Sequence, residues 1–334
     1  MTTYKEIFGK YVKNYSSDPT ADIEGQIWYN TTSGTFKSEV LVAAAWAAGG
    51  TLPSAKGSAN GGGLQTAAWM AGGERIPSSP GSGGLAMQTS TFEYDGATWT
   101  AGGNMGTGRT QASGGAGPQT SAYIAGGRTT NNPFTYTGDT EEYDGSTWTA
   151  GGSIGSSAYY GLRSGIGTQT AGLIASGIYI GNPGYQATAK EYDGTSWTAT
   201  NPVNTVGGLI GGAGIQTSGI IFGGTTRTTA SEEYNGTSFT SGNSLNTGRP
   251  GAVGAGNDNT NVIAFGGNAP SATEQYDGTS WATISATLGT ARDGGTSAGT
   301  QTSALYAGGV PDQSFTGSEE FTGDTLTVKT ITTS

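Results

Sequence analysis

The sequence contains neither cysteine nor histidine. Without cysteine the chain has no disulfide framework, no thiolate zinc site and no thiol nucleophile. Without histidine it lacks the side chain that most often serves as general base or transition-metal ligand, and a Ser-His-Asp triad is excluded. We therefore expect no bound metal, no cofactor and no catalysis of these kinds.

Basic residues are also scarce. Lysine and arginine together number 14, against 24 aspartates and glutamates, which gives a formal charge of −10. Binding to nucleic-acid phosphates or to anionic lipid needs basic surface, so this balance argues against both kinds of partner. The N-terminal stretch lacks the apolar core of a signal peptide, and no apolar run is long enough to span a bilayer. We expect no nucleic acid and no membrane insertion.

Glycine, in contrast, accounts for 62 of the 334 residues, and many glycines belong to a sequence that recurs. The stretch EEYDGSTWTAGG at 141–152 has close relatives along the chain, each preceded by a short apolar run that ends in two glycines. The aromatic residues that mark the copies are Tyr94, Tyr143, Tyr192, Tyr234, Tyr276 and, in the last copy, Phe321. Successive copies lie 42 to 49 residues apart. A period in this range indicates a repeat architecture.

Each repeat predicts four short strands. In the copy around Tyr143 these are ASGGAG at 112–117, AYIAGG at 122–127, EEY at 141–143 and TWTA at 147–150. A turn of the form GxQTS joins the first two strands. An Asp-Gly turn, which tolerates positive φ, joins the last two. The tyrosine and tryptophan are strand formers that we expect to pack across the hairpin and between repeats.

This pattern resembles the kelch repeat in the glycine pair, the tyrosine that follows it and the tryptophan five residues after the tyrosine. An arginine before the first strand also matches, at Arg109, Arg249 and Arg292, with Lys56 in the equivalent place. The resemblance covers residues 46–334. It implies an all-β fold, a six-bladed kelch-like β-propeller in which each repeat forms one blade.

Some copies depart from the pattern, and the ring needs a closing strand. The third copy has Ser176-Gly177, the fourth has Phe239 for tryptophan, and the sixth lacks both the Asp-Gly and the tryptophan. Residues 39–50, which include Trp46, match the end of a hairpin whose first half is absent, so we expect an N-terminal strand to complete the blade otherwise formed by the C-terminus. The C-terminal run LTVKTI at 326–331 competes for the same place, and the sequence leaves their order open. We expect a propeller domain at 39–334, closed by N- and C-terminal strands.

Residues 1–38 lie outside the repeats. The segment YKEIFGKYVKNY at 4–15 spaces its apolar residues along one face of a helix, which Asp18-Pro19 would end. The segment EGQIWYNTTSGTFKS at 24–38 predicts a β-hairpin around Thr-Thr-Ser-Gly. One interpretation of the whole stretch is a cap packed on the propeller.

The string DIEGQIWYNTTSGTFKS at 22–38 resembles a segment near the N-termini of bacteriophage virion proteins, especially tail-fibre and related appendage proteins of marine cyanobacterial phages. The resemblance implies that residues 1–38 anchor the chain to other virion proteins after synthesis in the bacterial host cytoplasm. A homo-oligomer is compatible with it, although no coiled-coil heptads enforce one. The anchoring side chains would be Tyr4, Ile7, Phe8, Tyr11, Ile27, Trp28, Tyr29 and Phe36.

Acidic and basic residues of the repeats invite a catalytic interpretation, which we weigh against a structural one. Four aspartates occupy Asp-Gly turns, where they act as turn formers: Asp95, Asp144, Asp193 and Asp277. Paired glutamates in strands point to opposite faces, which suits a carboxylate dyad poorly. We expect one glutamate per blade to pair with the recurring arginine. A sialidase-like arginine cluster remains an alternative, built from Arg109, Arg163, Arg249 and Arg292.

The loops of the repeats fall into two sets. The 1–2 and 3–4 turns at one end of a propeller are short and repetitive here, whereas the 2–3 and 4–1 loops at the other end vary. Binding residues favour variable loops on a rigid scaffold, and aromatic rings beside amides and carboxylates suit sugars. An equally weighted alternative is that these aromatics only hold their own loops. The candidate ligand-binding residues are Asn131, Asn132, Phe134, Tyr136, Tyr159, Tyr160, Tyr179, Asn182, Tyr185, Asp312 and Phe315.

These observations favour a non-enzymatic virion structural protein, a tail-fibre or baseplate-associated appendage that binds host-surface glycan or protein. The first alternative is a capsid or neck decoration protein with no receptor role. A glycan-cleaving propeller enzyme is the less supported alternative.

Overall fold

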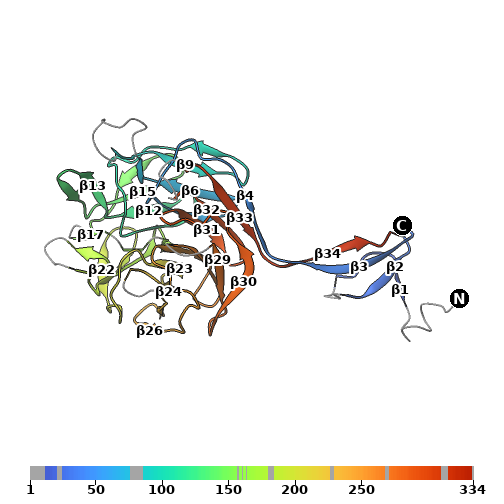
Figure 1. Cartoon of the computed structure of the whole chain (residues 1–334). Helices are drawn as coiled ribbons and strands as arrows, with labels where there is room; N and C mark the ends of the chain where they lie inside the picture. The colour runs from blue at the N-terminus through green and yellow to red at the C-terminus, as the bar shows by residue number, and fades with distance from the viewer. Residues whose placement is uncertain are drawn as a thin grey trace. The chain divides into compact units, whose positions relative to one another are not determined.

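The computed structural model describes residues 12–20, 25–75, 86–155, 158–159, 161–162, 164–179, 184–225, 229–267, 271–309 and 315–332. These residues form strands, turns and loops, and no helix that could cross a membrane occurs among them. The chain divides into two compact units (Figure 1). Unit 1 comprises Met1–Ala45 and Gly323–Ser334, and unit 2 comprises Trp46–Thr322.

The described residues of unit 2 form six four-stranded sheets, one for each predicted repeat. The first three sheets, from inner to outer strand, are β5 (Asn60–Leu64), β6 (Ala67–Ala71), β9 (Thr91–Tyr94) and β10 (Trp99–Ala101); β11 (Gly114–Ala116), β12 (Ala122–Ala125), β15 (Thr140–Tyr143) and β16 (Trp148–Ala150); and β18 (Ile166–Thr168), β19 (Ala171–Ala175), β21 (Ala189–Tyr192) and β22 (Trp197–Thr200). The other three are β23 (Gly211–Ile215), β24 (Ser218–Phe222), β25 (Ser231–Tyr234) and β26 (Phe239–Ser241); β27 (Ala252–Gly256), β28 (Val262–Gly266), β29 (Ala272–Tyr276) and β30 (Trp281–Thr287); and β31 (Thr296–Thr300), β32 (Ser303–Ala307), β33 (Ser318–Thr322) and β4 (Ala45–Ala48).

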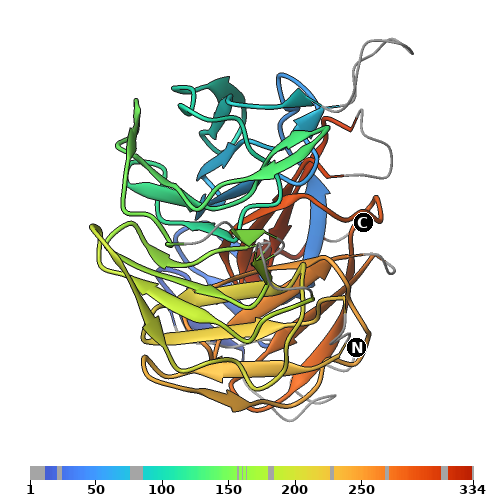
Figure 2. The same ribbon diagram turned by 90° about the vertical axis from the view of Figure 1, so that its left-hand side faces the viewer.

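The six inner strands form a closed ring. Each contacts the next in chain order, and β31 contacts β5. Figure 2 shows the sheets following one another around the ring from the N-terminal to the C-terminal colours. Glycine allows the close approach: a Cβ at Gly165 would lie 1.9 Å from the carbonyl oxygen of Gly115 in the neighbouring sheet. The prediction of an all-β propeller is therefore confirmed.

The N-terminal strand β4 completes the last sheet, next to β33. Its Trp46 indole donates to Thr273 Oγ1 at 2.9 Å and packs edge-on against Phe265 in the fifth sheet. The C-terminal strand β34 (Thr325–Thr330) instead pairs with β3 (Thr35–Val42) in unit 1. The expectation that an N-terminal strand completes the sheet formed by the C-terminal strands is therefore confirmed, and of the two candidates for this place it is β4, not the run at 326–331, that occupies it. The fourth strand of a sheet contributes an aromatic ring to the neighbouring sheet, and LTVKTI has none.

Buried ion pairs tie the 4–1 loops to the third strand of the same sheet. Arg109 bonds Glu141 at 2.5 Å, Arg249 bonds Glu274 at 3.1 Å, and Arg292 bonds Glu319. The predicted arginine–glutamate pairing is therefore confirmed in these three sheets. In the first sheet Phe92 takes the place of the glutamate. There the Lys56 ammonium lies 4.7 Å from the centre of the Phe92 ring and donates to the carbonyl oxygens of Gly72 and Ser90.

The part of unit 1 that the structure describes forms a four-stranded sheet in the order β1 (Lys13–Tyr15), β2 (Ile27–Asn30), β3 and β34. The predicted hairpin at 24–38 is confirmed, because β2 and β3 pair in antiparallel register around the turn. Of the predicted helix, residues 4–11 lie outside the described residues. Its end is wrong, since β1 is a strand that pairs in parallel with β2. The domain boundary expected after residue 38 falls inside β3, which continues to Val42.

Candidate functional site

The variable 2–3 and 4–1 loops meet at one end of the ring, as expected. Isolated β-bridges join the two sets, between Gly57 and Glu74 and between Thr110 and Arg128. Within the described loops, two-stranded sheets form at this end: β7 (Glu74–Arg75) with β8 (Ala86–Met87), β13 (Arg128–Asn131) with β14 (Phe134–Tyr136), and β17 (Ala158–Tyr159) with β20 (Ile178–Tyr179). We call this end the loop face.

The β13–β14 hairpin brings together four of the predicted ligand-binding residues: Asn131, Asn132, Phe134 and Tyr136. Phe134 is 58% exposed, the largest exposed fraction among the described large hydrophobic side chains. The guanidinium carbon of Arg128 lies 5.2 Å from the centre of the Phe134 ring. Arg128 is itself held by Glu74 in the adjacent loop, at 2.7 Å. The hairpin therefore exposes the Phe134 ring, while the Arg128–Glu74 salt bridge holds the start of the hairpin against the adjacent loop.

The β17–β20 sheet brings two further predicted residues into register. Tyr159 pairs with Ile178, and Tyr179 pairs with Ala158. Tyr185 follows in the same loop and makes a β-bridge with Ile178. Its ring packs on Gly208, where a Cβ would lie 2.1 Å from the ring. Tyr185 therefore holds its own loop against the next one.

Phe315 also has an intramolecular role. Its ring centre lies 4.8 Å from the guanidinium carbon of Arg292, which the buried ion pair with Glu319 already fixes. The tyrosine ring of Tyr306 lies 4.3 Å from the same guanidinium carbon. Phe315 is half-buried there and supports its own loop. Three predicted residues lie outside the described residues: Tyr160, Asn182 and Asp312.

The aspartates of the hairpin turns are turn formers, as expected. Asp95 accepts hydrogen bonds from the backbone N–H groups of Ala97 and Thr98 at 2.9 and 2.7 Å. These bonds hold the pKa of Asp95 below its usual value. The same bonds recur at Asp144, Asp193 and Asp277. Within the described residues, no three acidic side chains come together in a way that could hold a metal ion.

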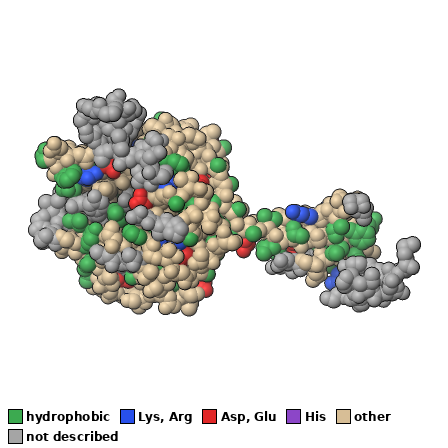
Figure 3. Space-filling view, viewed as in Figure 1, with side chains coloured by type: hydrophobic (Ala, Val, Ile, Leu, Met, Phe, Trp, Pro, Cys, Tyr) green, Lys and Arg blue, Asp and Glu red, His purple; other side chains and the backbone are tan. Residues whose placement is uncertain are grey.

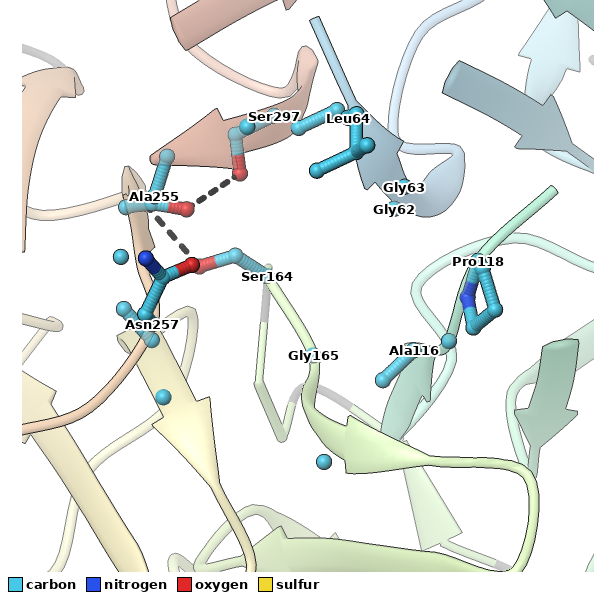
Figure 4. A pocket seen from close by; sticks show the side chains of 18 of the residues that line it. Gly62, Gly63, Leu64, Ala116, Pro118, Ser164, Gly165, Ala255, Asn257 and Ser297 are labelled. Carbon is cyan, nitrogen blue, oxygen red and sulfur yellow. Dashed lines mark hydrogen bonds between the residues drawn. The ribbon is translucent and has the colours of Figure 1, made fainter. Parts of the chain in front are cut away.

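A cavity of about 270 Å³ occupies the centre of the ring, lined by the inner strands of all six sheets (Figure 4). Its lining is mostly glycine and alanine, and no charged side chain of the described chain contributes to it. At its rim lie residues from the ends of the first strands and the turns that follow them: Leu64, Pro118, Thr168, Ile215 and Asn257. Leu64, at 55%, and Ile215, at 46%, are exposed.

The sequence interpretation missed this cavity because it treated the GxQTS turns as uniform. The variable residue after the glycine was the available signal, since the glutamine and threonine that follow it recur in every copy except the fifth, which reads Gly256-Asn257-Asp258. The hydroxyls of the cavity are engaged by the inner strands. Ser164 Oγ donates to Gly212 O at 2.6 Å and accepts from Gly254 N at 3.0 Å, and Ser297 Oγ donates to Gly254 O at 2.7 Å (Figure 4). Among the described residues that line the cavity there is no base that could activate either serine as a nucleophile.

The predicted anchoring residues divide between the described and the undescribed parts of unit 1. Tyr4, Ile7, Phe8 and Tyr11 lie outside the described residues. Trp28 is buried, and its indole donates to Asp18 at 3.1 Å. Ile27, Tyr29 and Phe36 lie on the β2–β3 hairpin, where the rings of Tyr29 and Phe36 are 5.1 Å apart between centres.

Comparison with known proteins supports the fold and goes no further. No protein-family model matches the sequence, and no curated protein matches it. Among solved structures, the structure of YjhT matches with a TM-score of 0.60 over 84% of this chain and 99% of that chain, at 15% sequence identity. At so low an identity the likeness shows the fold alone, a β-propeller.

Proposed function

We propose that this chain is a non-enzymatic structural protein of a bacteriophage particle, in a tail-fibre or baseplate-associated appendage. Unit 1 anchors the chain to other virion proteins, and the kelch-like propeller of unit 2 is displayed to bind host-surface glycan or protein. The virion assignment rests on the resemblance of residues 22–38 to phage appendage proteins. Its support is that this stretch belongs to a separate small sheet, which also takes in the C-terminal strand β34.

The observation that carries the binding part of the proposal is the β13–β14 hairpin. Aromatic side chains are enriched among the residues that dominate binding energy at protein interfaces, and rings beside hydrogen-bonding groups suit sugars. The Phe134 side chain is 58% exposed, and the Arg128–Glu74 salt bridge holds the strand that begins its hairpin. Asn132, which is exposed at the turn of the same hairpin, adds an amide group. We place the contact surface for the host here.

The non-enzymatic part is supported by the way the chemically capable side chains are used. Arg109, Arg249 and Arg292 are buried in ion pairs with their own sheets, so they are not available to hold an anionic substrate. Their glutamate partners also accept backbone N–H groups, as Glu141 does from Gly106 at 2.6 Å. A general acid or base needs a group that reaches the substrate.

Binding of the purified full chain to host cells tests the receptor role. Phe134→Ser is expected to weaken binding by about tenfold or more, because truncating a central aromatic contact commonly costs about 2 kcal/mol. Leu64→Ser is the matched control: Leu64 is about equally exposed but lies at the cavity, at the end of β5. Equal binding by the two variants would contradict the placement of the contact surface.

Two further outcomes separate the alternatives. Absence of binding by the unmodified chain, together with its presence in particles, would favour a decoration protein with no receptor role. Release of reducing sugar from host envelope by the purified chain would favour a glycan-cleaving enzyme.

A further inference from the structure

The dipeptide Asn-Gly occurs at two places in the sequence, Asn60-Gly61 and Asn235-Gly236. Glycine carries no side chain, so its backbone nitrogen can approach the amide carbon of the preceding asparagine without obstruction. When the nitrogen attacks Cγ, a succinimide ring forms, and the amide leaves as ammonia with the proton of the glycine N–H. Water then opens the ring to aspartate or isoaspartate, and the chain becomes about 1 Da heavier. The fold places the two dipeptides in opposite environments.

Asn60 begins β5, one of the inner strands of the ring, and is 3% exposed. Its Nδ2 donates to the carbonyl oxygen of Leu162 at 3.4 Å. A Cβ at Gly61 would lie 2.1 Å from the carbonyl oxygen of Trp69 in β6, so the backbone has no room to bend towards the asparagine side chain. Ring closure at Asn60 therefore requires the inner strand to open, and so does the entry of water.

Asn235, in contrast, lies exposed in the turn between β25 and β26. Its Oδ1 accepts hydrogen bonds from the backbone N–H groups of Thr237 and Ser238, each at 3.0 Å. These donors polarise the amide carbonyl, and they stabilise the negative charge that develops on Oδ1 when the nitrogen attacks Cγ. Gly236 has a φ of 86°, a conformation that disfavours any side chain, so the turn itself requires the reactive glycine.

The equivalent turns of four other sheets show that this position accepts the product of the reaction. They carry aspartate in place of Asn235: Asp95, Asp144, Asp193 and Asp277. At Asp144 the same oxygen, Oδ1, accepts from the N–H groups of Ser146 and Thr147 at 2.8 and 2.7 Å. The N–H groups of Thr147 and Ser146 lower the pKa of Asp144, so it stays a carboxylate, which resists nucleophilic attack and has no amine to release. The fourth sheet thus has the same turn with a reactive amide.

We propose that Asn235 is a site of spontaneous deamidation in the folded chain and that Asn60 is protected from the same reaction. The aspartate product keeps the turn, because its carboxylate accepts the same two N–H groups. Each event replaces a neutral amide by a carboxylate and adds one negative charge to a chain of formal charge −10. The inference rests on the propeller alone and is independent of the virion assignment.

Peptide mass spectrometry of the full chain, after incubation in warm, mildly alkaline buffer, tests the proposal. The Asn235 peptide is expected to gain about 1 Da at least tenfold faster than the Asn60 peptide, since Asn60 reacts only when its strand opens. In denaturant the two should react at similar rates, because both asparagines then precede an unhindered glycine. An Asn235 that stays unmodified while the denatured chain converts overturns the proposal, as do equal rates in the folded chain.

A transplanted site tests the role of the turn. Asp144→Asn creates a further Asn-Gly in an equivalent turn and is expected to convert within about threefold of the rate at Asn235. Asn235→Asp is the matched control, with no mass gain at this turn and an unchanged thermal transition. Charged side chains are sparse on the visible side of the propeller (Figure 3), so anion-exchange chromatography resolves the added carboxylate in the intact chain. Conversion at Asn235 but none in Asp144→Asn would overturn the role assigned to the turn.

Discussion

The hydroxyl of Tyr94 donates a hydrogen bond to Glu320 Oε1 at 2.5 Å and so joins the first sheet of the propeller to the last, 226 residues away. The same contact links four more neighbouring sheets: Tyr143 with Glu93, Tyr192 with Glu142, Tyr234 with Glu191 and Tyr276 with Glu233. At the remaining junction the equivalent positions hold Gln275 and Phe321. Phenylalanine replaces the tyrosine that would donate, and glutamine replaces the glutamate that would accept. No carboxylate is therefore left at this junction without a hydrogen-bond donor.

Breaking one of these junctions therefore has a predictable cost. Tyr94→Phe should lower the free energy of unfolding by about 1–3 kcal/mol, because Glu320 loses its donor and the Gly50 N–H loses its acceptor. The double variant Tyr94→Phe/Glu320→Gln imitates the natural Phe321–Gln275 junction and should recover part of that loss. Denaturant unfolding of the four members of the cycle measures it. Strict additivity of the two substitutions would show that the pair is not coupled.

The ring also depends on glycine where inner strands approach. Gly165→Ala should destabilise the propeller by about 3 kcal/mol or more, because the new Cβ would lie 1.9 Å from a backbone oxygen of the next sheet. Gly106→Ala is the control, since its nearest neighbour is the end of the Glu141 side chain, at 3.3 Å. Thermal unfolding compares the two variants. Similar transition temperatures would contradict the close packing of inner strands.

High pH should unfold the propeller through its tyrosines. Burial raises the pKa of Tyr94, Tyr143, Tyr192 and Tyr234 to about 12, from 10.0. A group whose folded-state pKa is raised contributes stability that is complete below its unfolded pKa and is lost as the pH rises through the folded one. The transition temperature should therefore fall between about pH 10 and pH 12. Absorbance of tyrosinate should rise together with unfolding; ionisation of these tyrosines near pH 10 in the folded chain would refute the coupling.

Lys56 should make stability rise with pH over a lower range. Its burial lowers the pKa of its ammonium group from 10.5 to about 7. Between these values the unfolded chain binds a proton that the folded chain does not, so the free energy of unfolding increases with pH from about 7 towards 10. Lys56→Met should flatten this dependence, whereas Lys329→Met, an exposed substitution in unit 1, should not. Thermal unfolding at pH 6, 7.5 and 9 measures it, and an unchanged slope in Lys56→Met would argue against a buried charge.

Local sequence signals predicted most of the propeller. The Asp-Gly turn at Asp144 and the glycine pair at Gly126 and Gly127 act within one hairpin or one strand end, where sequence and geometry correspond directly. The arginine–glutamate pairs were also predictable, because an unpaired charge near a core is costly and opposite charges that recur together in each repeat normally form ion pairs.

Contacts between repeats were harder to infer. Gln119 donates to the carbonyl oxygens of Ala68 and Tyr94 in the preceding sheet, at 2.9 and 3.2 Å, although its sequence context indicated only a turn. Which strand completes the last sheet depends on a contact with the neighbouring sheet. Trp46 packs against Phe265 there, whereas the run at 326–331 has no aromatic residue. The strand at Lys13–Tyr15 forms through pairing with β2, which the helical spacing of the segment does not reveal.

The loop aromatics show the same limit. Tyr185 and Phe315 are the residue types that bind sugars, yet each packs within the protein, on Gly208 and on Arg292. Phe134 has the same chemistry and remains exposed. A sequence does not distinguish these cases, because the difference lies in which backbone or side chain the fold brings beside each ring.

Localisation on purified particles tests the central claim most directly. Antibodies against residues 46–322 should label the tail or its fibres in immunogold electron microscopy, because the proposal displays the propeller from an anchored N-terminal unit. Label over the head would contradict the receptor role and favour a decoration protein. No label on intact or disrupted particles would contradict the virion assignment itself.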